Sequence, residues 1–382
     1  MSFAENSRQL YPLGVCEDSN FTWFTVAYPN IIIRVDMRSN ATRRFIIDPR
    51  SISNTDGYRF MHIVGDEIVL VPSNSDMITV FDKNTYRFKH VDLREFSRPK
   101  NENYFVKVRF SCSFAYQDSV YMLGGFYPAI VKLDLKTSNI TYYTEWVEEI
   151  DEMTENGDTC GHFGPGSVVK DSVAYAPVAC ANALLQIGLL DDSIKIRTID
   201  SGYKGYYSLA SCAGSDYIWA SSRHVSDSGS IICLDLSSET INRFCFPDSK
   251  VDTLYNLVEF EDEIYAFPES GGHVYVIDND TKTICIAEKL ESVLVNNLAE
   301  ICKTGYISPH FVGTDLYITT SYDCCRHVID MSNCDEKNRV YFVRDRSDYE
   351  LSNELIRNSI KKDLVLNEKD FSVDEFINGL LY

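Results

Sequence analysis

The strongest constraint on the fold is a motif that recurs about every fifty residues. It consists of an acidic turn followed by a short β-rich run, as in GDEIVLV at 65–71 and EDEIYAF at 261–267. Spacings between successive turn aspartates are 48, 52, 53, 45, 46 and 53 residues. The seven aspartates are Asp18, Asp66, Asp118, Asp171, Asp216, Asp262 and Asp315. Seven copies of one supersecondary unit therefore fill most of the 382-residue chain.

A second series of aspartates runs in step with the first. An apolar strand ends in aspartate and a polar turn follows, as in ITVFDKNT and IICLDLSSET. Its members are Asp36, Asp82, Asp134, Asp235, Asp278 and Asp330, with Gly188 in place of aspartate in the fourth copy. Each unit then predicts four antiparallel strands, which in the second copy span 59–64, 67–71, 78–82 and 86–91.

Four-stranded units of this length bury both sheet faces by packing on their neighbours around a closed ring. Over residues 11–344 the chain resembles the seven-bladed β-propellers, which implies an all-β domain of residues 1–344. No WD dipeptide ends the third strands, and the Gly124-Gly125 pair does not recur as in kelch repeats, so the resemblance names no single family. The first blade has four strands of its own, so no clasp strand is needed; a mixed blade using the stretch before Tyr11 or part of the tail is the alternative.

Two segments have helical rather than strand periodicity. Residues 345–382 are rich in charged residues and asparagine, and they predict a short α-helical C-terminal tail. A similar pattern over 290–301 predicts a helix inserted between blades six and seven. Both helices are expected to pack on the rim of the propeller, and the alternative for the tail is that it docks a partner.

The net charge limits the classes of partner. With 36 Lys and Arg against 56 Asp and Glu, the chain has a formal charge of −20 and no basic stripe. Nucleic acid and anionic membrane surfaces are therefore not expected partners. A segment resembling a membrane span, 173–190, is interrupted by Pro177, Asn182 and Gln186 and is better explained as strand, turn and strand.

Residues 1–20 contain no apolar stretch of the kind found in a secretory signal, which favours a cytoplasmic protein. Twelve cysteines without a CxxC pair are expected to be free thiols in a reducing compartment. The sequence does not determine the oligomeric state.

Propellers commonly bind ligands at one face, in a funnel formed by the loops that enter the first strand and leave the second strand of each blade. Counting back from each turn aspartate, and adding the loops after the second strands, gives polar and aromatic candidates for contacting a ligand. The candidates are Arg59, Arg109, His162, Tyr207, Arg223, His224, Tyr255, Glu269, Tyr306 and Tyr322. This composition suits a protein segment, a peptide or a carbohydrate, and it also suits a mouth that is polar only because water fills it.

An enzyme of the same fold is the alternative to a binding or scaffold protein. His162 and His310 are candidate bases, Glu269 is a candidate acid, and His224 lies in a similar segment. The chain is similar in this respect to propeller lyases and lactonases, which implies a lyase, hydrolase or isomerase acting on a small polar ligand such as a sugar or lactone. Two histidines converging on a carboxylate would favour the enzyme.

No cofactor or metal site is predicted, although the similarity to metal-dependent propeller enzymes keeps a divalent metal in the funnel as an alternative. The run Cys324, Cys325, His327 and Cys334 lacks a usual zinc spacing. The acidic stretch 148–158 lacks the alternating ligands of a calcium loop, so a solvated acidic lid is the preferred interpretation.

Overall fold

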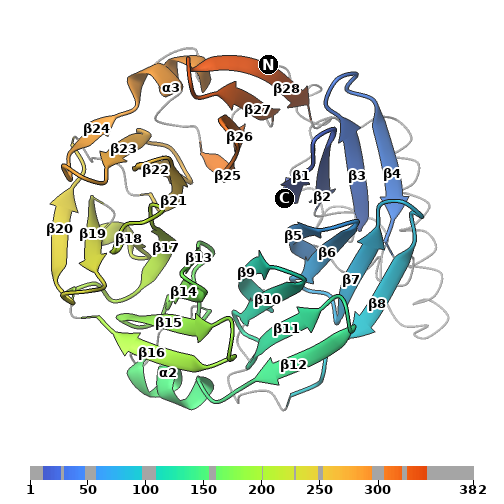
Figure 1. The fold of residues 1–382 in the computed structure, drawn as a ribbon, viewed down its shortest axis with the longest axis horizontal. Helices are drawn as coiled ribbons and strands as arrows, with labels where there is room; N and C mark the ends of the chain where they lie inside the picture. The colour runs from blue at the N-terminus through green and yellow to red at the C-terminus, as the bar shows by residue number, and fades with distance from the viewer. Residues whose placement is uncertain are drawn as a thin grey trace, which may run out of the picture.

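The computed structural model describes residues 12–26, 30–47, 57–96, 109–154, 161–199, 201–227, 229–247, 253–294, 305–320 and 325–341. These residues form seven four-stranded antiparallel sheets arranged around a ring (Figure 1). Every sheet consists of four strands that are consecutive in the chain. The seven-bladed β-propeller predicted from the sequence is therefore confirmed.

The blades are numbered in chain order. Blades 1 to 4 contain β1–β4 (Pro12–Glu17, Phe21–Val26, Ile31–Asp36, Thr42–Ile46), β5–β8 (Tyr58–Val64, Glu67–Pro72, Met77–Asp82, Phe88–Asp92), β9–β12 (Phe110–Tyr116, Ser119–Gly124, Ile130–Asp134, Asn139–Tyr143) and β13–β16 (Val168–Lys170, Val173–Pro177, Ala183–Gly188, Ile194–Thr198). Blades 5 to 7 contain β17–β20 (Tyr206–Ala210, Tyr217–Ser222, Ser230–Asp235, Ile241–Cys245), β21–β24 (Tyr255–Phe260, Glu263–Pro268, Tyr275–Asp278, Ile284–Ile286) and β25–β28 (Tyr306–Val312, Asp315–Thr320, Cys325–Asp330, Asp335–Tyr341).

The first strand of each blade lies nearest the axis of the ring and the fourth lies at the periphery (Figure 1). The strands predicted for the second copy match β5–β8 to within about two residues. Residues 173–190 contain β14 and β15, as expected for strand, turn and strand. No described helix is both long and apolar enough to cross a bilayer.

Both aspartate series lie in hairpin turns at one face of the ring. A carboxylate oxygen of Asp82 accepts hydrogen bonds from the backbone N–H groups of Asn84 and Thr85, at 2.8 and 2.9 Å. Asp36 and Asp278 make the same pair of bonds two and three residues ahead. An aspartate at this position satisfies turn donors that would otherwise have no partner, which explains why the residue recurs in nearly every copy.

Apolar residues fill the interfaces between successive blades. Between blades 5 and 6, for example, Trp219, Tyr255 and Tyr275 are at most 2% exposed and belong to one buried cluster. Burying an aromatic or aliphatic side chain of this kind contributes about 1.5–3 kcal/mol. The hydrophobic core of the protein is thus divided among the interfaces around the ring.

Backbone hydrogen bonds also join neighbouring blades at the face opposite the aspartate turns, which we call the mouth. There the loop entering the first strand of a blade bonds both to the loop that follows the second strand of the same blade and to the corresponding loop of the preceding blade. The N–H to carbonyl series runs Ser73 to Gly57, Arg109 to Ser73, Gly125 to Arg109, His162 to Gly125 and Ala179 to His162, at 2.7–3.0 Å. A Cβ at Gly124 would overlap the Tyr127 carbonyl, so this close approach explains the glycine there.

Two short helices lie at the rim. Helix α2 (Val147–Met153) includes the first part of the acidic stretch, and its Glu148, Glu149 and Glu152 side chains are exposed to solvent. Helix α3 (Glu288–Leu294) confirms the start of the helix predicted over 290–301 and buries Leu290 and Leu294 against blades 6 and 7. The tail at 345–382, the rest of that predicted helix and the end of the acidic stretch lie outside the described residues.

Candidate functional site

Two predicted ligand contacts, Tyr207 of blade 5 and Glu269 of blade 6, lie together at the mouth with Asn256 of blade 6, which was not predicted. We call these three residues the mouth cluster. The Tyr207 hydroxyl donates a hydrogen bond to Oε1 of Glu269, and Nδ2 of Asn256 lies 3.5 Å from the same oxygen. Tyr207 lies in β17, Asn256 in β21, and Glu269 directly follows β22. Glu269 is exposed whereas Tyr207 is 9% exposed, so a nearly buried phenol orients an accessible carboxylate.

The electrostatics of the cluster keep Tyr207 protonated. Burial raises the pKa of its phenol well above the usual value, the Glu269 carboxylate raises it further, and the charge of Arg59 partly opposes both. A protonated phenol is a hydrogen-bond donor, which matches the bond to Glu269. Arg59 comes from blade 2, so residues from three blades act at this part of the mouth.

The predicted arginines lie at different places around the mouth. Arg59 is exposed, and Arg109 forms an ion pair with Asp76 of blade 2. The backbone N–H of Arg223 donates to the carbonyl of Gly205 at 3.1 Å. Arg59 is thus the exposed cation whose charge reaches the mouth cluster.

Two predicted ligand contacts are core residues in the structure. Tyr255 is 2% exposed and packs with Phe246 and Tyr275, and Tyr306 is fully buried beside Phe267. Their rings lie in apolar clusters between blades because an aromatic ring gains more from burial there than at a wet rim. Tyr322, also predicted, lies outside the described residues.

His162 lies at the mouth but has structural partners on both ring nitrogens. Nδ1 lies 2.8 Å from the carbonyl of Gly125, and Nε2 lies 3.0 Å from Oδ1 of Asp151 in α2. Its ring also packs edge-on against buried Trp146, with centroids 5.2 Å apart. These contacts attach α2 to the loop before β13, and they leave neither nitrogen available as a base.

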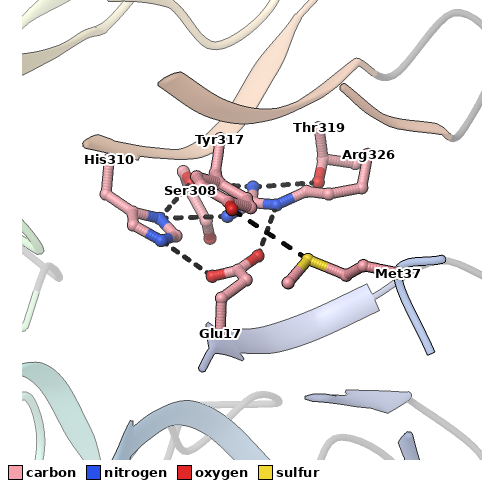
Figure 2. Close-up of polar contacts among 7 residues, drawn as sticks. All are labelled: Glu17, Met37, Ser308, His310, Tyr317, Thr319 and Arg326. Atoms are coloured by element: carbon pink, nitrogen blue, oxygen red, sulfur yellow. Dashed lines mark hydrogen bonds and ion pairs between the residues drawn. The ribbon is translucent and has the colours of Figure 1, made fainter. Parts of the chain in front are cut away.

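His310 lies near the hairpin end of its strand rather than at the mouth. Its ring faces Glu17 of another blade (Figure 2). In β25 it is two residues from the hairpin end at Val312 and four from the start at Tyr306. Nε2 lies 2.7 Å from Oε2 of Glu17 in blade 1, and Nδ1 lies 3.0 Å from Nη2 of Arg326. The prediction that it belongs to a top-face segment is therefore wrong, because β25 carries the side chain towards the opposite face.

His224 makes its hydrogen bonds within its own loop. Its backbone bonds to Ser222 fix the loop after β18, and its Nε2 is buried without a hydrogen-bond partner. The three histidines therefore have separate environments on three blades.

Sequence reasoning missed His62, whose Nε2 lies 2.7 Å from Oγ of Ser113 in the neighbouring blade. Burial lowers the pKa of His62 to about 4, so the imidazole is neutral near pH 7. The sequence did place His62 in the predicted first strand of blade 2, which lies beside the first strand of blade 3. The contact joins β5 to β9.

Among the described residues, no three His, Cys, Asp or Glu side chains are grouped so as to hold a metal ion. In the predicted Cys and His run, His327 instead bonds to Glu336 at 2.6 Å and to Thr320 at 3.0 Å. Cys325 begins β27 and Cys334 lies in the turn beyond its end, while Cys324 is outside the described part.

Comparison with known proteins supports the fold. No family model matches the chain, and no curated protein matches its sequence. A catalytically inactive variant of virginiamycin B lyase from Staphylococcus aureus, crystallised with quinupristin, matches with a TM-score of 0.58 and 12% identity over 87% of this chain and 95% of that one. BamB from Moraxella catarrhalis matches at 0.51 and 15% over 80% and 81%, and YCF48 from Cyanidioschyzon merolae at 0.54 and 12% over 81% and 92%. At these identities the similarity establishes a shared propeller fold.

Proposed function

We propose that this protein is a non-enzymatic binding propeller that holds a protein segment, a peptide or a carbohydrate at its mouth. The observation that carries the proposal is the accessible Glu269 carboxylate, oriented by Tyr207 and Asn256, with the exposed cation of Arg59 nearby. A carboxylate held in this way accepts hydrogen bonds from hydroxyl, amide or ammonium groups, which both classes of ligand offer.

The arrangement of the histidines favours binding over catalysis. Catalysis by the predicted residues needs two histidines near a shared carboxylate, but His162 bonds to Asp151 and His310 to Glu17. Glu269, the candidate acid, bonds to a tyrosine and an asparagine instead. The lyase among the structural neighbours keeps an enzyme of this fold as the competing hypothesis.

The proposal includes the cellular setting. Buried cysteines such as Cys16, Cys112 and Cys233 are free thiols, which supports a reducing compartment such as the cytoplasm. The charge of −20 argues against nucleic acid or anionic membrane as the partner.

A binding screen tests the proposal. Immobilised peptide and oligosaccharide libraries are probed with the wild-type chain and with Glu269→Gln, and hits are measured by titration calorimetry. Binding by the wild type that weakens about tenfold in Glu269→Gln supports the proposal, as expected for loss of one charge-assisted hydrogen bond. Glu261→Gln is the matched control, because Glu261 is exposed on the same blade at the opposite face.

Two outcomes contradict the proposal. If every hit binds Glu269→Gln and the wild type equally, the ligand site lies elsewhere. If a hit is converted to product by the wild type, the protein is an enzyme.

A further inference from the structure

The closure of the ring poses a physical problem that the sheet topology leaves open. A ring can be closed by one blade that combines strands from both ends of the chain. Here, within the described residues, blade 1 consists of β1–β4 and blade 7 consists of β25–β28, so neither blade is mixed. In the described part of the chain, the contacts between these two blades are made by side chains. We call the contact between them the seam.

A charged cluster lies in the seam. Glu17 ends β1, Arg326 lies in β27 and His310 lies in β25, so one residue of blade 1 meets two of blade 7 (Figure 2). Nε of Arg326 donates to Oε1 of Glu17 at 2.8 Å, and Nε2 of His310 lies 2.7 Å from Oε2. We call Glu17, His310 and Arg326 the latch.

His310 contacts both ions of the latch. Its Nδ1 lies 3.0 Å from Nη2 of Arg326 and 3.3 Å from the carbonyl oxygen of Ser308. Its Nε2 faces the Glu17 carboxylate, which pairs directly with the Arg326 guanidinium. The imidazole therefore lies against both members of the ion pair.

The two ions of the latch are buried in the seam. The side chains of Glu17 and Arg326 are 1% and 0% exposed, whereas that of His310 is 35% exposed. A buried charge without its partner carries a large desolvation cost. In the closed ring each ion compensates the charge of the other, so removing one partner would leave the other buried and unpaired. Opening the seam would then let water reach the remaining charge, so loss of one partner favours opening at this place.

The backbone of β25 is adapted to this cluster. The register of β25 against β26 shifts between Ile307 and His310, and Ser308 has a φ of +47°. The Ser308 carbonyl accepts from Nη1 of Arg326 at 2.9 Å, and Pro309, with no N–H to donate, follows it. A bulge of this kind redirects a side chain, and here it lies directly before His310.

The apolar part of the seam is one-sided. Its buried cluster contains Phe24, Ile31, Ile33 and other residues of blade 1, and Val340 is the residue that blade 7 contributes in the described part. Asn338 adds a hydrogen bond to the Met37 carbonyl at 2.5 Å, and the Tyr317 hydroxyl lies 4.0 Å from the Met37 sulfur. Among the described residues, the latch is therefore the main charged link across the seam, and blade 7 contributes little to its apolar cluster.

We propose that Glu17, His310 and Arg326 form the latch that closes the propeller ring, and that the seam opens first when the latch is lost. Opening would separate β1 from β25 and β27 while the other blades stay packed. The inference does not depend on the proposed ligand site, which lies on blades 5 and 6.

Hydrogen exchange followed by mass spectrometry tests the proposal on the full chain. In Glu17→Gln we expect exchange in peptides covering β1, β25 and β27 to accelerate about tenfold or more, because charge-assisted bonds across the seam are lost. Peptides covering blades 3 to 5 should exchange as in the wild type.

Glu291→Gln is the matched control. Glu291 is also buried and paired with a histidine, His273, but both lie in blade 6 and α3 rather than at the seam. We expect this variant to leave exchange at β1 unchanged. If Glu17→Gln fails to fold, His310→Gln replaces it, with a smaller acceleration in the same strands.

The proposal is overturned by either of two results. One is unchanged exchange at the seam in a folded Glu17→Gln or His310→Gln variant. The other is acceleration of similar size in all seven blades, which would assign the latch to global stability rather than to closure.

Discussion

The interface between blades 5 and 6 and the seam between blades 7 and 1 close the same ring with different chemistry. The first is an apolar cluster to which both blades contribute, with Trp219 and Ile231 on one side and Leu257 and Ile264 on the other. The second depends on a buried carboxylate and guanidinium. Interfaces between consecutive blades form from segments close in sequence, whereas the seam joins residues 309 positions apart.

The difference indicates what each interface provides. Apolar packing is non-directional and tolerates small shifts, while an ion pair with a bridging imidazole holds a defined geometry. The mouth cluster lies on the apolar interface, where Ser221 also donates to the carbonyl of Tyr255 at 2.7 Å. The candidate site is therefore supported by a densely packed part of the ring.

The largest effect is expected from Arg326→Met, which leaves the Glu17 carboxylate buried without its cation. We expect a loss of about 3–5 kcal/mol in the free energy of unfolding, measured by urea denaturation. The double variant Glu17→Gln with Arg326→Met should recover part of this loss, because no buried charge remains. A double variant less stable than Arg326→Met would show that Glu17 is stabilising without its partner, contrary to this account.

Next comes Leu257→Ala at the apolar interface. Leu257 is 6% exposed in the cluster between blades 5 and 6, and truncating it should cost about 3 kcal/mol through lost contacts and a cavity. Unlike the loss at the latch, this one should not change between pH 7 and pH 3 relative to the wild type. A strong pH dependence would contradict the contrast between the two interfaces.

Acid should weaken the seam through Glu17. Burial alone would raise the pKa of this carboxyl, but Arg326 and His310 together lower it from 4.5 to about 2. Because the pKa is lower in the folded protein, the stabilisation is complete above about pH 4.5 and is lost as the pH falls towards 2, on the order of 2–3 kcal/mol. Unfolding free energies of wild type and Glu17→Gln should converge over that range, and parallel curves would refute the assignment.

The smallest change in stability is expected from Tyr207→Phe at the mouth. The variant removes the hydrogen bond to Glu269, and because that carboxylate is exposed, water replaces the phenol at a cost below about 1 kcal/mol. Affinity for a ligand found with the wild type should nevertheless fall about three- to tenfold, since Glu269 loses its orientation. Unchanged affinity would remove Tyr207 from the site.

The fold was predictable because its signals are local. Asp82 caps a turn two and three residues ahead, and such turns recur in step with the strands, so periodicity alone identifies the blades. The site was only partly predictable. Counting by two along a strand located Tyr207 but also selected Tyr255, whose ring lies in the buried cluster between blades 5 and 6.

The latch was not predictable from sequence because it is entirely long-range. Glu17 precedes a turn aspartate in the first copy, and nothing near it in the sequence indicates a partner in the seventh. The sequence predicted His310 as a candidate base but placed it near the wrong face, and the bulge at Ser308 lies directly before it in β25.

Hydrogen exchange of the wild-type protein, measured blade by blade at neutral pH, tests most directly whether the two interfaces differ as described. The account predicts that β1 and β25 exchange through openings of lower free energy than β17 and β21, because an apolar interface must open for the latter. Equal protection of the two pairs of strands, or faster exchange in β17 and β21, would contradict it.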